Sequence, residues 1–130
     1  MADYTTQFTI DEKGDVTGKD YAGVFTVKTR LTHNDRFKQD AIKRGLLGGD
    51  PTTASPQAQS MAEAFSQISI RVIDAPDWWK QSDGGTQLAD FSVITSIYTK
   101  AIEAENAEID KVVKSAKNIK ESLKTPIINE

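Results

Sequence analysis

The sequence predicts an α+β fold in one domain of 130 residues, in which an N-terminal antiparallel β-hairpin precedes about three helices, the last of them long. A change of periodicity supports this prediction. Apolar residues alternate along residues 4–31, as in a half-buried strand, whereas beyond Thr32 they recur every three or four residues, as on an amphipathic helix. A chain of this size buries roughly two-thirds of the surface that its unfolded form exposes, which is enough for one hydrophobic core.

The hairpin is expected within residues 1–31. Phe8 alternates with Ile10, Phe25 alternates with Val27, and the link between the two runs contains glycine, aspartate and lysine. A lone hairpin is marginally stable in water. We therefore expect it to pack on the helices or on a neighbouring chain, which makes Phe25 and Val27 candidate contacts to a partner.

Residues 32–85 are expected to form two helices and an aromatic loop. Thr32 and Asp35 have the spacing of a capping box, which predicts a helix that ends at Gly45 or at the Gly48–Gly49 pair. The segment GGDPTTASP that follows has the composition of a loop.

A second helix is predicted after Ser55, because serine is a favoured N-cap and Pro56 suits the first helical position. Its apolar stripe would run to Val72. The alternation in Ile68–Val72 is also typical of a strand, but the longer window favours a helix. Pro76 disfavours helical geometry in the residue before it, so the helix should end earlier.

The third helix is expected over residues 86–124, with a tail at 125–130. Ile109 belongs to an apolar series that recurs every seven residues for about three heptads, as in a coiled coil. The members are Ile102, Ile109, Ala116 and Leu123, with Val112 and Ile119 between them. If this part of the helix projects past the body, its stripe has no partner within the chain.

Composition limits the function classes. The chain has no cysteine and a formal net charge of −3, which excludes a thiolate zinc site and argues against nucleic-acid or anionic-membrane binding. No run approaches the 18 apolar residues of a membrane span, and residues 1–9 lack the features of a secretion signal. We expect synthesis and use in a cytoplasm, or in an assembly built there.

Catalytic and metal-binding patterns are weak. His33 is the only histidine, and an exposed position in a first helical turn explains it better than a general base does. Residues 11–22 lack the glycine and glutamate of a calcium loop, and the glycines at 45–49 lack the lysine of a phosphate-binding loop. Asp74, Asp77 and Asp83 have the usual place of turn-forming residues. We expect no catalytic residue, metal or cofactor.

Trp78 and Trp79 stand side by side in the segment DAPDWWKQSDGG. Adjacent residues point about 100° apart on a helix and to opposite faces of a strand. One indole can therefore anchor the loop while the other contacts a partner, as aromatic side chains often do at interfaces. The alternative, that both pack internally, stays open.

Four segments together resemble small structural or assembly proteins of tailed bacteriophages. They are DYAGVFTVKTRLT, IKRGLLGG, SQISIRVIDAPDWWKQSDGG and DFSVITSIY, and the similarity spans residues 20–105. The resemblance implies a non-enzymatic part of the virion, assembled in the host cytoplasm, that binds other phage subunits of capsid, connector or tail, or copies of itself. It implies no membrane, nucleic-acid or small-molecule partner.

Two alternatives remain at this point: an assembly chaperone absent from the mature particle, and a small hydrolase or sugar-binding protein that uses the loop of Asp77, Trp78 and Trp79. The hairpin favours a structural component over a chaperone, because an all-helical architecture is expected of the latter. The candidate interface residues are Phe25, Val27, Trp78, Trp79, Ile109, Val112, Ile119 and Leu123.

Overall fold

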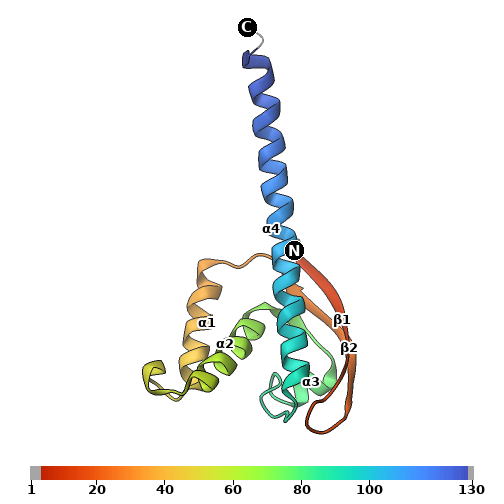
Figure 1. Cartoon of the computed structure of the whole chain (residues 1–130), viewed down its shortest axis with the longest axis vertical. Helices are drawn as coiled ribbons and strands as arrows, with labels where there is room; N and C mark the ends of the chain where they lie inside the picture. Colours follow the sequence, from red (N-terminus) through yellow and green to blue (C-terminus); the bar gives the residue numbers. More distant parts are fainter. Residues whose placement is uncertain (1–3, 129–130) are drawn as a thin grey trace.

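The computed structural model describes the backbone of residues 4–128 and the side chains as far as Asn118, except that of Pro51. A three-stranded sheet and four α-helices form a body from which the last helix extends (Figure 1). The α+β class, with an N-terminal antiparallel sheet and a long final helix, is confirmed.

Strands β1 (Thr5–Lys13) and β2 (Asp20–Lys28) form the predicted hairpin, with Phe8 opposite Phe25 and their rings stacked at 5.6 Å. The prediction of a two-stranded hairpin was incomplete, because β3 (Val72–Asp74) pairs antiparallel with the other edge of β2. Of the alternation around residue 70, therefore, only the end is a strand: α2 continues to Arg71, and the chain becomes extended from Val72 up to Pro76.

Helices α1 (His33–Leu46) and α2 (Pro56–Arg71) begin where the caps predict. Thr32 and Asp35 form the reciprocal capping box, and Ser55 accepts a hydrogen bond from the amide of Ala58. A short 3₁₀ turn (Pro51–Thr53) lies between the two helices. Among the residues of α1, only Asp35 is buried, and polar contacts such as the 2.8 Å ion pair between Lys43 and Glu63 join α1 to α2.

The segment predicted as an aromatic loop contains a short helix, α3 (Asp77–Gln81), which starts after Pro76 and holds both tryptophans. The next turn places Asp83, Gly84 and Gly85 at positive φ. This turn delays the long helix, which begins at Phe91 and not at residues 86–88 as predicted.

Helix α4 (Phe91–Ile128) has 38 residues and is about 57 Å long at 1.5 Å per residue. Its first half contacts α2 and β1, and its second half leaves the body (Figure 1). The helix passes the predicted end at Lys124 and continues through Pro126 to Ile128. We call residues 109–128 of α4 the stalk and residues 4–108 the body.

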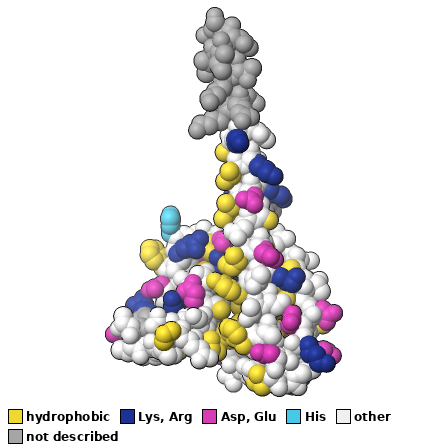
Figure 2. Space-filling model, in the orientation of Figure 1, with side chains coloured by type: hydrophobic (Ala, Val, Ile, Leu, Met, Phe, Trp, Pro, Cys, Tyr) yellow, Lys and Arg dark blue, Asp and Glu magenta, His cyan; other side chains and the backbone are white. Residues whose placement is uncertain are grey.

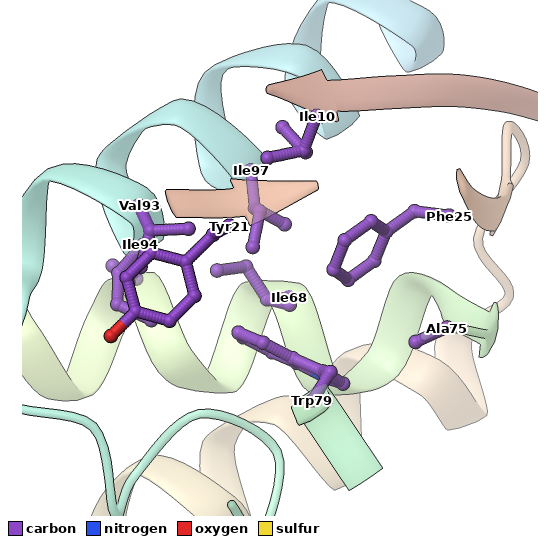
Figure 3. Packing of buried hydrophobic residues seen from close by; sticks show 10 residues of the cluster. Ile10, Tyr21, Phe25, Ile68, Ala75, Trp79, Val93, Ile94 and Ile97 are labelled. Atoms are coloured by element: carbon purple, nitrogen blue, oxygen red, sulfur yellow. The ribbon is translucent and has the colours of Figure 1, made fainter. Parts of the chain in front are cut away.

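The core lies where α4, α2, α3 and the sheet meet (Figure 3). The apolar stripes contribute only in part: Ile68 and Ile94 are buried, whereas Met61 and Phe91 are each 37% exposed. The buried members of the cluster are Ile10, Tyr21, Phe25, Ala64, Ile68, Ala75, Trp79, Val93, Ile94 and Ile97.

Candidate protein-interaction surface

The two tryptophans are mostly part of the core. Trp79 is 5% exposed, and its ring contacts that of Phe25 at 5.5 Å. Trp78 is half-buried; its ring lies 5.1 Å from that of Tyr21, and its indole N–H donates to the carbonyl of Ala22 at 2.9 Å. Both indoles therefore brace the sheet, and only part of Trp78 remains available to a partner.

The predicted hairpin contacts are not on the surface. The side chains of Phe25 and Val27 have no exposed area. Alternation defines which side chains share a face of β2, and this face turns toward the core of the same chain. We therefore remove Phe25, Val27 and Trp79 from the candidate interface as corrections to the sequence-based prediction.

The acidic residues near the tryptophans serve the local turn. The carboxylate of Asp74 accepts hydrogen bonds from the ammonium group of Lys80 and the amide of Ala75, at 3.0 and 2.9 Å. The bond from Lys80 is the main cause that lowers the pKa of Asp74. Asp83 occupies a left-handed turn position with φ of 56°. His33 is exposed at the start of α1.

Sequence reasoning missed the role of Asp90, which fixes the base of α4 to the β1–β2 turn. Its buried carboxylate accepts two hydrogen bonds from the backbone amides of Val16 and Thr17, both 2.7 Å, and two from the hydroxyls of Thr17 and Tyr21, at 2.5 and 2.6 Å. Burial by itself raises the pKa of Asp90, but the hydrogen bonds outweigh it and hold the pKa well below its ordinary value.

The attachment is reciprocal. Asp15, in the hairpin turn, accepts a hydrogen bond from the amide of Ser92 in the first turn of α4, at 3.2 Å. The Ser92 hydroxyl accepts from the amide of Asp15 and donates to the carbonyl of Lys13. We call this group of contacts around Asp90 and Ser92 the clasp. No local sequence motif indicates the clasp, because its bonded residues lie 69 to 79 positions apart in the chain.

A second fixed point lies where α4 leaves the body. Arg71, 2% exposed, donates to the carboxylate of Glu105 at 2.8 Å and to Gln67. The guanidinium of Arg30 pairs with Glu108 at 2.8 Å. These contacts hold the proximal half of α4 in a defined orientation, and so they define the direction of the stalk.

The stalk carries exposed apolar side chains, among them the predicted Ile109 and Val112. Ile109, Val112 and Val113 are 50%, 45% and 58% exposed. Figure 2 shows apolar side chains along one edge of the stalk and on the body below it. The predicted contacts Ile119 and Leu123 fall outside the described side chains, so these two remain predictions.

A groove joins this stripe to the body. It has a volume of about 390 Å³ and lies between the stalk, the β2–α1 connection and the start of α1. Its apolar lining comes from Leu31, Ile109, Val112 and Val113. Its charged lining consists of Arg30, Arg36, Glu105 and Glu108. Leu31 and Val113 are members of this surface that the sequence analysis did not single out.

No protein family, curated protein or solved structure matches this chain. Within the described residues, no group of three or more histidine or acidic side chains is placed to hold a metal ion. None of the described helices is long and apolar enough to cross a membrane. The groove and the stripe of the stalk together form an extended, partly exposed apolar surface.

Proposed function

We propose that this chain is a non-enzymatic structural or auxiliary protein of a tailed-phage virion, and that it binds other subunits through the stalk. The proposal depends on the exposure of Ile109, Val112 and Val113 on the part of α4 that extends beyond the body. The resemblance of residues 20–105 to small phage assembly proteins supplies the biological setting.

The physical support is the free energy available on docking. Full burial of one aliphatic side chain contributes about 1.5–3 kcal/mol. Because Ile109, Val112 and Val113 are each about half exposed, covering them adds roughly 1 kcal/mol per side chain. The apolar stripe and groove lie beside two ion pairs, Arg30 with Glu108 and Arg36 with Glu105. Polar groups around a desolvated centre are the arrangement of a protein interface.

The body suits a positioning role. The clasp at Asp90 and the ion pair of Arg71 with Glu105 fix α4 at two separate levels. A helix held in this way presents its distal face at a constant orientation to the body. This is useful in a subunit that must join two neighbours at a defined spacing.

The experiment compares three forms of the phage that encodes the chain: wild type, the double variant Ile109→Asp with Val113→Asp, and the control Asn118→Asp. Asn118 is exposed and lies about 180° around the helix from Ile109 and about 140° from Val113. Mass spectrometry of purified particles should find the wild type and the control, and much less of the double variant.

Equal incorporation of all three forms would contradict the stalk as the binding surface. Absence of the wild type from mature particles would contradict the structural function and would favour an assembly chaperone. A gene that lies apart from the phage structural genes would remove the setting altogether. Circular dichroism of the purified double variant checks that its body remains folded.

A further inference from the structure

We infer that a second copy of this chain covers the exposed face of α4, with the two helices antiparallel. The inference rests on the proposed function in one respect: it names the partner of the same surface. It depends on three properties of α4: a continuous apolar face, the distribution of charge along the chain, and the position at which the helix leaves the body.

The apolar face extends beyond the stalk. Side chains on one side of α4 recur at spacings of three, four and seven residues along the whole described part of the helix, the pattern of a coiled-coil seam. Phe91, Ile109 and Val113 are 37%, 50% and 58% exposed, Tyr98 and Ile102 are half-buried, and Ala116 is exposed. The polar members of this face are Thr95 and Asn106. A partner helix can therefore contact both the body half and the stalk half.

Charge is divided between the two halves. Residues 4–108 contain 11 Lys and Arg against 15 Asp and Glu, a formal charge of −4, whereas residues 109–118 contain three lysines against one aspartate, a charge of +2. A parallel pair would place body beside body and stalk beside stalk, so like charges would meet. An antiparallel pair places each cationic stalk on the anionic body of the other copy.

The exit point divides α4 into nearly equal parts. Residues 91–108 cover about 27 Å and residues 109–128 about 30 Å at 1.5 Å per residue. A two-fold axis near Ile109 and Asp110 therefore lets each stalk span the body half of its partner. This axis brings Glu103 to about the level of Lys117 of the other copy. Neither residue has an ion-pair partner within the described part of the chain.

The alternative occupant, a helix of a different protein, could cover the same apolar residues. It would not by itself call for opposite charges on the two halves of α4, whereas an antiparallel pair brings the lysines of each stalk beside the acidic half of the other copy. The second copy satisfies both halves of the surface with the same residues, as an isologous interface does.

Sedimentation equilibrium of the purified full-length chain tests the association. We expect a dimer whose dissociation constant rises at least about a hundredfold in the double variant Ile109→Asp with Val113→Asp, and less than about threefold in the control Asn118→Asp. A monomeric wild type overturns the inference. Equal weakening by the double variant and by the control also overturns it, because the interface would then lie on another face.

Salt and cross-linking test the orientation. Attraction between stalk and body predicts weaker association toward ~1 M salt, where the Debye length falls to about 3 Å; tighter association would contradict it.

Because the chain has no cysteine, Ile102→Cys and Lys117→Cys can be introduced singly. An antiparallel dimer gives a disulfide only when the two variants are mixed, since the two copies of residue 102 lie about 22 Å apart along the axis. Disulfides within each variant alone would show a parallel pair and overturn the proposed arrangement.

The two proposals fail separately. A monomer that is still present in purified particles would end the dimer inference and leave the virion function in place. A dimer that is absent from particles would do the opposite.

Discussion

The closest packing in the clasp is between Gly14 and Asp90, and it predicts a strong coupling between these positions. A methyl group on Gly14 would lie 2.3–2.5 Å from the three carboxyl atoms of Asp90. These atoms cannot move aside without loss of the four hydrogen bonds that they accept. Overpacking at such a site costs about 1–3 kcal/mol, and we expect Gly14→Ala to lower the free energy of unfolding by ~3 kcal/mol.

Asp90→Ala removes the acceptor itself. Hydrogen bonds to a charged group contribute about 1.5–3 kcal/mol each. Because water can bond to some of the freed donors at the partly exposed turn, we expect the free energy of unfolding to fall by ~4 kcal/mol in total. The melting temperature should then fall by about 10–20 °C. In this background the methyl group of Gly14→Ala meets no carboxylate, and its cost should drop below ~1 kcal/mol.

Urea unfolding of the four forms, followed by tryptophan fluorescence at one protein concentration, measures the double-mutant cycle. The expected coupling energy is about 2–3 kcal/mol. Gly45→Ala is the control, because a methyl group there has no atom within 4 Å and should stabilise α1 by about 0.5–1 kcal/mol. Additive costs at Gly14 and Asp90 would refute the reasoning, since the methyl group would then be harmful for a cause other than the carboxylate.

Three further predictions follow from the buried groups. Glu105→Gln removes the carboxylate that pairs with the buried guanidinium of Arg71, and urea unfolding should show that the free energy of unfolding falls by about 3–5 kcal/mol. A fall below ~1 kcal/mol would contradict a structural role of this ion pair. Because folding lowers the pKa of Asp90, the folded state binds fewer protons than the unfolded state near pH 4, so this contribution is present at neutral pH and is lost as the pH falls below about 4. Asp90→Asn should flatten the decline measured between pH 7 and pH 3, and an unchanged slope would refute the assignment. Trp79→Ala should cost about 3–5 kcal/mol and Trp78→Phe ~1 kcal/mol, and acrylamide should quench Trp78 more than Trp79; the reverse order of quenching would contradict their placement.

Local signals were enough to predict most of the elements. The capping box at Thr32, the Ser55–Pro56 start and the alternating strands each act within a few residues, and the structure has all three. β3 was missed because three residues pair with a strand more than 40 residues earlier. α3 was missed because glycine, proline and aspartate on either side are typical of a loop.

The candidate surface was only partly predictable, for a related reason. Periodicity shows which side chains share a face but not what that face meets. Phe25 belongs to an alternating run and Ile109 to a heptad series, and both were predicted as interface residues, yet the first is wholly buried and the second is half exposed. The difference depends on where α4 leaves the body, and this is fixed by contacts distant in sequence, those of Asp90 with the hairpin and of Arg71 with Glu105.

Helix α4 continues without interruption from the core into the stalk, so the number of stalk residues sets the distance between the body and the tip. Each residue inserted beyond the body would advance the tip by about 1.5 Å and turn it by about 100°. An insertion of seven would add a near-integral number of turns and return the contact face to its original direction. An insertion of two residues would turn that face away from its original direction, although the side chains that form it would be unchanged.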